Sequence, residues 1–287
     1  MSMTSAEESA VTKFAVRLVP FLGLMFFINY PDRTAISFAG PNGMNQDLGL
    51  SAAQFGFASG IFFIGYIILE VPSNLALHKF GARVWLARIM ITWGIVALLF
   101  TWASSARALY IFRFLLGVAE AGFFPGAILF LSMWVPASHR SKILSLFYLA
   151  QPLTTVIGAP LAGALIAQHG IFGLEGWRFM FMGVAIPAIV VGIIAWFYLS
   201  DRPAQASWLS KEEKKALSDK LELEAKGKDI LHHASIRTVL FNGRVWTLSL
   251  IYFGFIYAFM PSRSFFPRLL PDSRRSMALS SMCMRKA

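Results

Sequence analysis

Long apolar stretches, separated by short polar segments, occupy most of the first 200 residues. About 20 predominantly apolar residues are enough for a helix to cross a bilayer. A seventh, shorter stretch begins near Val245 and stops near Met260. The pattern predicts an all-α membrane protein, a six-helix transmembrane bundle followed by a truncated seventh helix. The six predicted spans are 14–39, 52–76, 84–103, 107–134, 143–168 and 178–200.

The polar segments divide the chain into further parts. The first apolar run is too long for a signal peptide and contains two charged residues, so we keep it as a helix. The bundle is therefore preceded by a short tail and followed by a polar linker. The expected organisation is an N-terminal tail at 1–13, the six-helix domain at 14–200, a cytoplasmic linker at 201–244, the start of a seventh helix at 245–260 and a tail at 261–287.

Two features stand out after the sixth span. Ser210 and Glu213 have the spacing of a capping box, which predicts a helix from Lys211 to about Lys226. Residues 261–287 are rich in Arg, Ser and Pro, a composition that cannot continue a membrane helix. We interpret this tail as atypical and favour a truncated or frameshifted gene; a native tail is the open alternative.

Composition supports the membrane interpretation. The chain is 56% hydrophobic and 14% charged, whereas soluble domains carry about 25% charged residues. The net charge of +11 is concentrated in the tail and in short segments between apolar runs, a placement typical of topology signals rather than of nucleic-acid binding. The single cysteine, Cys283, excludes a disulfide framework and a Cys-based zinc site.

Basic residues also indicate the orientation. They cluster before the first span, between the second and third, and between the fourth and fifth, whereas the intervening loops are poor in bases. By the positive-inside rule, the N-terminus is cytoplasmic. We expect a multi-pass protein of the cell inner (plasma) membrane, in contact with the lipid bilayer and not with nucleic acid.

Four ionisable residues stand out inside predicted spans: Asp32, Arg33, Arg113 and Glu120; Glu70 is a fifth, nearer the cytoplasmic end of its span. Such residues are costly in a bilayer and are functional by default. Arg113 and Glu120 are seven residues apart and share one helix face, whereas Asp32 and Arg33 point about 100° apart. Asp32 and Arg113 have similar depths, so we expect that they can pair.

The four charges sum to zero. Protonation of Asp32 or Glu120 leaves one net positive charge, and an arginine is then free to bind an anion through two parallel hydrogen bonds. A structural ion-pair network that holds helices together is the open alternative. Two uncharged polar residues inside spans, Tyr66 and Gln151, are suited either to substrate contact or to bonds between helices.

Glycine and proline positions add expectations about packing. Gly56-xxx-Gly60 and Gly122-xxx-Gly126 have the spacing that lets helix backbones approach closely. Pro125, Pro152 and Pro160 interrupt hydrogen-bond ladders inside spans, either as simple kinks or as the walls of a cavity.

Taken together and in order, several motifs resemble the N-terminal half of a major facilitator superfamily transporter, in the anion:cation symporter branch of tartrate, phthalate and galactonate permeases. The resemblance covers about residues 14–260. Its motifs are Asn29-Tyr30-Pro31-Asp32-Arg33, Glu70-Val71-Pro72-Ser73-Asn74, the run from Arg113 to Glu120, the run from Gly158 to Gly163, Asp201-Arg202-Pro203 and Trp208-Leu209-Ser210.

The resemblance implies roles by position. Asp32 and Glu120 match proton-coupling carboxylates, Arg33 matches a substrate-contacting arginine, and Arg113 matches the arginine that partners a carboxylate. Tyr66 and Gln151 match polar positions of the substrate cavity.

A loop after the second span is similar to the conformational gate of the superfamily. Its residues are His78, Lys79, Gly81 and Arg83. The family usually has an acid where this chain has His78, so this chain departs from the family in the residue that forms the acid-based latch of the gate.

The function that follows is proton-coupled symport of organic anions by alternating access, with no cofactor and no metal. The other half of such a carrier is absent from this sequence, so we expect that the chain does not catalyse coupled transport alone; self-association of two half-transporters is an open alternative. A non-transporting remnant or accessory subunit is a second class. A membrane-embedded enzyme is the least supported class, because HExxH and GxSxG are absent and His232 and His233 are adjacent.

Overall fold

The computed structural model describes residues 5–229 and 241–255. In these ranges every regular element is a helix. The chain divides into two compact units, Met1–Lys226 and Gly227–Ala287. In the second unit, residues 243–255 form a helix whose side chains are exposed. The predicted end of the seventh stretch at 256–260 and the tail at 261–287 lie outside the described residues.

The first unit contains six helical stretches that are long and apolar enough to cross a membrane, as the sequence predicts. Most begin and end within a few residues of the predicted limits. The main helices are α1 (Ser5–Ala39), α3 (Ala52–Phe80), α4 (Ala82–Leu99), α5 (Ala106–Glu120), α6 (Phe123–Trp134), α7 (Ala137–Tyr148), α8 (Ala150–Ile166), α9 (Gly176–Tyr198) and α10 (Lys211–Asp229), with α2 (Asn45–Asp47) and short π- or 3₁₀-helical turns between them.

The fourth and fifth spans are each made of two helices. Between α5 and α6, Gly122 adopts the left-handed conformation with φ of 84°, which L side chains rarely adopt. Between α7 and α8, the regular α-helical hydrogen bonding is interrupted at Leu149, three residues before Pro152. The fifth span also begins earlier than the predicted residue 143, because α7 starts at Ala137, directly after the non-helical Pro136.

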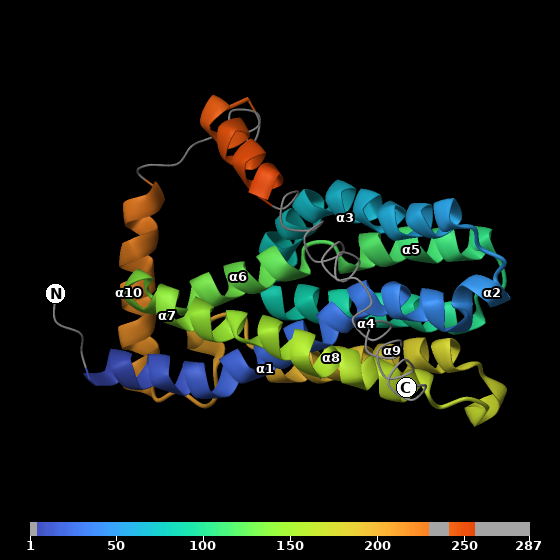
Figure 1. Ribbon diagram of the computed structural model, residues 1–287. Coiled ribbons are helices and arrows are strands. Elements are labelled where there is room, and N and C mark those ends of the chain that lie inside the picture. The colour runs from blue at the N-terminus through green and yellow to red at the C-terminus, as the bar shows by residue number, and fades with distance from the viewer. Residues whose placement is uncertain (1–4, 230–240, 256–287) are drawn as a thin grey trace, which may run out of the picture. The chain divides into compact units, whose positions relative to one another are not determined.

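The spans form two groups of three. α1, α8 and α9 pack together, as do α3, α4 and α5, and the extensive α4–α9 contact joins the groups. Figure 1 shows α3 and α5 along one side of this unit and α1, α8 and α9 along the other. Contacts from α1 to the second group therefore lie inside the bundle.

Glycines allow the closest helix approaches. A Cβ added to Gly117 of α5 would lie 2.0 Å from the carbonyl oxygen of Phe62 in α3, and one added to Gly65 would lie 2.5 Å from that of Phe114. The expected contact at Gly56 and Gly60 is not formed within the described residues, because both glycines have nothing within 4 Å of an added Cβ. The spacing was right for a contact, but these two residues lie on the outer side of α3.

The linker helix α10 is tied to the start of α1. Glu213 accepts hydrogen bonds from Ser9 (2.7 Å) and from Lys13 (2.7 Å), and with Ser210 it forms the predicted capping box. These contacts hold the part of α1 that precedes residue 14, the predicted start of the first span; α1 is described from Ser5 onwards. At the other end of α10, Glu224 accepts a hydrogen bond from the Ala137 backbone N–H at the start of α7.

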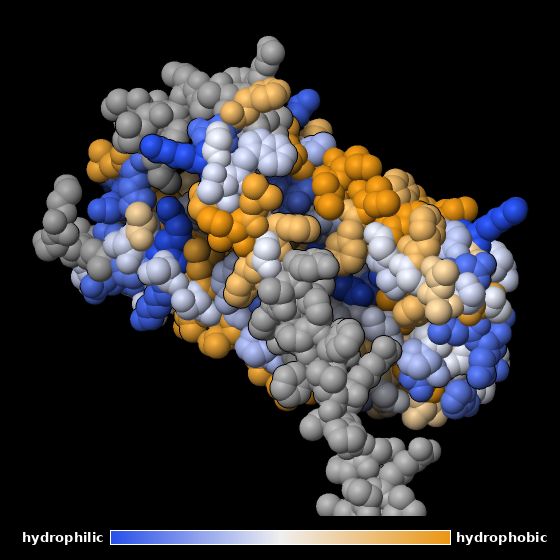
Figure 2. All heavy atoms as spheres, turned by 45° about the horizontal axis from the view of Figure 1, so that its top comes forward, coloured by the Kyte–Doolittle hydropathy of each residue, from blue (hydrophilic) through white to orange (hydrophobic). Residues whose placement is uncertain are grey.

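The surface has the polarity expected of a membrane protein. Figure 2 shows hydrophobic residues over the middle of one face and hydrophilic residues towards its two ends. Large exposed apolar side chains follow α3 and α9, among them Ile67, Ile68 and Phe197. Such residues are expected to face lipid.

Gly117→Ala should destabilise the first unit by about 1–3 kcal/mol, because the added methyl group overlaps the backbone of α3 and forces the two helices apart. Thermal unfolding in detergent measures the effect. Gly60→Ala is the matched control and should change the stability little, since its Cβ meets open space. Equal effects of the two substitutions would contradict the close α3–α5 contact.

Glu213→Gln should destabilise the α10–α1 contact by about 0.5–1 kcal/mol at neutral pH, since its partner Lys13 is half exposed. Glutamine has one acceptor oxygen, so it can keep the capping box with Ser210 but loses the charge and the acceptor for Ser9 and Lys13. The Lys13 ammonium and the Ser9 hydroxyl lower the pKa of the Glu213 carboxyl from 4.5 to about 2. The contribution is therefore complete above about pH 4.5, the ordinary pKa of the carboxyl, and is lost as the pH falls towards 2. Stability measured against pH should show the parent and the variant converging over this range, whereas Asp219→Asn, on the exposed side of α10, should follow the parent throughout.

Candidate functional site

The four charged residues that the sequence singles out come together inside the first unit. Asp32 and Arg33 lie on α1, and Arg113 and Glu120 lie on α5, which belongs to the other three-helix group. Asp32, Arg113 and Glu120 are 1–2% exposed, whereas the Arg33 side chain is 30% exposed. The cluster therefore lies where α1 crosses the second group.

Glu120 is held from α1. Arg33 donates from Nε to Oε1 of Glu120 at 2.9 Å, and the Asn29 amide donates to the same oxygen. Asn29 and Arg33 are four residues apart on one helix face, so both reach the same partner. An asparagine inside an apolar span, four residues before Arg33, was the sequence signal that could have predicted this role for Asn29.

Asp32 points in a different direction. It accepts a hydrogen bond from the indole Nε1 of Trp93, a fully buried residue of α4. The expected pair between Asp32 and Arg113 is not formed as an ion pair in the described part of the chain. Arg113 instead donates from Nε to the Ala58 carbonyl oxygen at 3.3 Å. Similar depth did not imply contact, because the rotation of α1 turns Asp32 towards α4.

Aromatic rings complete the surroundings of both arginines. The Arg113 guanidinium lies 5.0 Å from the centre of the Phe62 ring, and the Arg33 guanidinium lies 5.8 Å from it. The Arg33 guanidinium is also 4.8 Å from the centre of the Tyr66 ring. Such cation–π contacts stabilise a desolvated cation. Sequence reasoning missed Phe62 and Trp93, because one aromatic residue among 27 phenylalanines and eight tryptophans carries no distinguishing signal.

Each of the four charged residues retains a buried polar atom that has no hydrogen-bond partner among the described residues. These atoms are Oδ1 of Asp32, Nη2 of Arg33, Nη1 of Arg113 and Oε2 of Glu120. Most buried polar atoms in proteins are paired. Two unfilled arginine donors and two unfilled carboxylate acceptors are the groups that an anion and a proton require.

Gln151 and the predicted gate lie elsewhere. Gln151 is the second residue of α8, and its side chain is exposed. Gly81 makes the turn between α3 and α4 with φ of 90°, and the backbone N–H of Arg83 donates to Asp201 at 2.8 Å. His78 is exposed.

Asp201 thus brings a carboxylate to this turn from a position after α9. A negative charge at the N-terminus of α4 is favourable. The acid expected at residue 78 is missing from the local sequence, but a distant residue supplies one to the same turn.

In the part of the chain that the structure describes, no three His, Cys, Asp or Glu side chains come together as a metal site. His232 and His233 lie outside that part.

Comparison with protein families identifies the class. A family model described as the Major Facilitator Superfamily matches residues 22–281. The chain therefore belongs to the major facilitator superfamily, whose members matched below are membrane transporters.

Two relatives illustrate the similarity. A protein of Agrobacterium vitis named "Putative tartrate transporter" is 49% identical over 248 residues, which are 86% of this chain and 55% of that protein. The inner membrane transport protein RhmT of Escherichia coli strain K12 is 38% identical over 267 residues, 91% of this chain and 61% of that protein. The chain thus spans about half the length of the curated relatives it matches.

Solved structures share the fold. A bacterial homologue of the human lysosomal transporter Spinster superposes with a TM-score of 0.60 at 22% identity, over 71% of this chain and 45% of that one. The xylose transporter XylE of Escherichia coli superposes with a TM-score of 0.58 at 19% identity, over 75% of this chain and 57% of that one. At these identities the similarity concerns the fold alone.

Trp93→Phe should destabilise the bundle by about 1–3 kcal/mol, since a buried carboxylate loses its donor. A double-mutant cycle with Asp32→Asn, read by thermal unfolding in detergent, should show a coupling of at least about 1 kcal/mol. Trp102→Phe, at an exposed tryptophan, is the control and should not couple to Asp32. Additive effects of Trp93→Phe and Asp32→Asn would show that the contact contributes nothing.

Proposed function

We propose that this chain forms the N-terminal half of a secondary active transporter for organic anions, carboxylates and sugar acids, and that it couples their movement to protons. The observation that carries the proposal is the set of buried, unfilled polar atoms on Asp32, Arg33, Arg113 and Glu120. Tartrate, a dicarboxylate named for the Agrobacterium vitis relatives, fits this chemistry.

The proposed substrate contact is made by Arg33. Its side chain is the most exposed of the four, so a ligand can approach the guanidinium from the surface of the unit. Its buried Nη2 has no hydrogen-bond partner among the described residues and is left to donate to a ligand that enters the site. The planar guanidinium binds a carboxylate through parallel hydrogen bonds. Tyr66 and Phe62 limit the positions that the guanidinium can adopt.

The proposed proton site is the pair of carboxylates. Glu120 holds Arg33 through an ion pair, and a proton on Glu120 would weaken that pair and release the arginine for the substrate. Asp32 is held by a neutral donor, Trp93, and thus titrates without breaking an ion pair. Arg113, with one unfilled donor beside these groups, compensates their charge.

The remaining assignments follow the same proposal. The N-terminus is cytoplasmic, because bases lie at the ends where α1, α3 and α7 meet the solvent. The turn at Gly81 and Arg83, with Asp201, is the proposed conformational gate. Alternating access requires a second six-helix half, and the substrate site of such a transporter lies between its two six-helix halves.

Substrate binding can be measured on the 287-residue chain itself. Purified protein in detergent should be stabilised against heat by tartrate or galactonate, as expected for a ligand that binds only the folded state. Arg33→Gln should abolish the shift. Arg107→Gln, at an exposed position at the start of α5, should leave it unchanged. If the anion raised the unfolding temperature of both variants equally, it would be acting on the protein surface and not at Arg33.

Coupling can be measured in a chimera in which residues 1–255 are joined to the remaining part of the Agrobacterium vitis relative. Membrane vesicles with an imposed pH gradient should accumulate labelled tartrate. Glu120→Gln should abolish accumulation but retain exchange of internal for external substrate, because only the proton site is lost. Accumulation by the Glu120→Gln chimera at the parent level would reject the coupling role of Glu120.

A further inference from the structure

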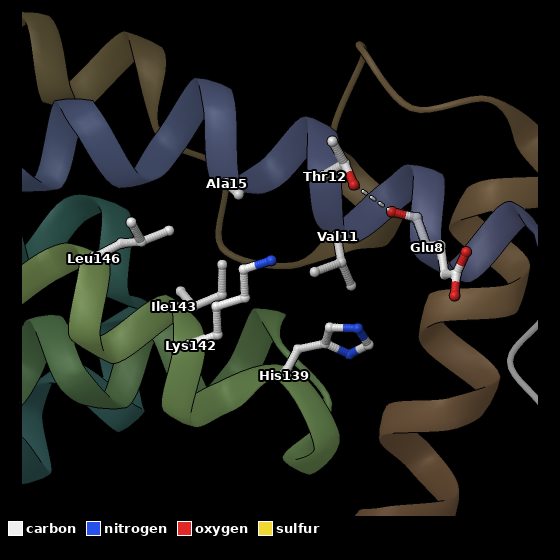
Figure 3. Close-up of a pocket in the computed structure, with 8 residues that line it drawn as sticks. All are labelled: Glu8, Val11, Thr12, Ala15, His139, Lys142, Ile143 and Leu146. Atoms are coloured by element: carbon white, nitrogen blue, oxygen red, sulfur yellow. Dashed lines mark hydrogen bonds between the residues drawn. The ribbon is translucent and has the colours of Figure 1, made fainter.

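A cavity of about 370 Å³ that is open to the surface lies between α1 and the first turns of α7, apart from the charged cluster. Four of the residues that line it, Glu8, Thr12, Lys142 and Leu146, are exposed. Figure 3 shows the side chains of both helices that point towards it. Its lining residues are Glu8, Val11, Thr12 and Ala15 of α1 and His139, Lys142, Ile143 and Leu146 of α7.

The polarity of the cavity changes along its length. Both helices run in the same direction, and in Figure 3 Glu8 and His139 lie at one end while Ala15 and Leu146 lie at the other. Lys142 lies between these ends. One end of the cavity is therefore polar and charged, and the end nearer the middle of both spans is apolar.

Two opposite charges line the cavity without neutralising each other. Within the described residues, neither Glu8 nor Lys142 takes part in an ion pair, since the pairs found there involve other side chains. The side chain of Thr12 donates to the backbone carbonyl oxygen of Glu8 at 2.8 Å and keeps its acceptor capacity. One ring nitrogen of His139 contacts the Ser138 hydroxyl at 3.1 Å, which leaves the other nitrogen for the cavity.

The depth of the cavity matches the headgroup region of a bilayer. The span that contains α7 and α8 has 30 residues, and at 1.5 Å per residue it is about 45 Å long. The hydrocarbon core is about 30 Å thick. The first turns of α7 therefore lie at the level of lipid headgroups, and the apolar end of the cavity lies at the level of the first acyl carbons.

We propose that this cavity binds a zwitterionic phospholipid with a primary ammonium group, that is, a phosphatidylethanolamine. Its phosphate contacts Lys142 and the ring of His139, its ammonium donates to Glu8, and its first acyl carbons lie along Ala15 and Leu146. A purely anionic headgroup would face the like charge of Glu8. A quaternary ammonium headgroup lacks the N–H donors that a carboxylate accepts.

The test is native mass spectrometry of the purified 287-residue chain titrated with short-chain phosphatidylethanolamine, phosphatidylcholine or phosphatidylglycerol. The parent should bind the ethanolamine lipid in preference to the other two. Lys142→Gln and Glu8→Gln should each weaken that binding about tenfold, the loss expected for a charged hydrogen bond. Lys215→Gln and Glu222→Gln, at exposed positions of α10, are the matched controls and should bind as the parent does.

A gain of function separates the proposal from simple misfolding. Glu8→Lys should reverse the preference towards phosphatidylglycerol, which a misfolded variant cannot do. Equal binding of the three lipids by the parent, or pocket variants that behave like the controls, would overturn the proposal. Free phosphoethanolamine that binds as tightly as the lipid would also overturn it, because the apolar end of the cavity would then have no role.

Discussion

Four ionisable groups inside a membrane-spanning bundle impose the main constraint on this structure, because each would be costly in hydrocarbon if it faced lipid. The bundle meets this constraint by directing them to the place where α1 crosses α4 and α5. Among the described residues, Asn29, Arg33 and Trp93 each contact their carboxylate across the boundary between the two three-helix groups. These contacts add to the α4–α9 contact that joins the groups, whereas Arg113 donates to Ala58 within its own group.

The broken fourth span follows from the same constraint. Glu120 is the last residue of α5, and the left-handed Gly122 follows two residues later. A side chain at Gly122 would clash with the Ser73 hydroxyl, 2.5 Å from an added Cβ. Glu120 is thus fixed between a helix end and a turn that tolerates only glycine. In membrane proteins, irregular backbone of this kind is tolerated where it is buried in protein or lines a cavity.

Much of the architecture was predictable from the sequence, because hydrophobic length determines a span and the capping-box spacing determines the start of α10. The charged set was predictable for the same reason, since a charge within an apolar run is visible without a structure. Its pairing was not predictable. Depth along a helix is set by residue number, but the direction of a side chain depends on how each helix is rotated in the bundle, and this left Asp32 with Trp93 rather than Arg113.

Glycine spacing was equally ambiguous. The same four-residue interval marks a surface without contacts at Gly56 and Gly60 but a close contact with α3 at Gly122 and Gly126. Single glycines at 65 and 117 mark another close approach of two helices. The side of a helix that faces a neighbour is determined by the assembled bundle, so it cannot be predicted from the sequence of a single span.

The contact between Ser9 and Glu213 joins residues that are 204 positions apart. During synthesis the ribosome releases Ser9 long before α10 exists. The contact between α1 and α10 can therefore form only after α10 has been made. Closure of the bundle at this end is then a late event, after all six spans have entered the membrane. A fusion partner placed at the N-terminus would act on that final step, and a cleavable tag is the safer choice for producing the protein.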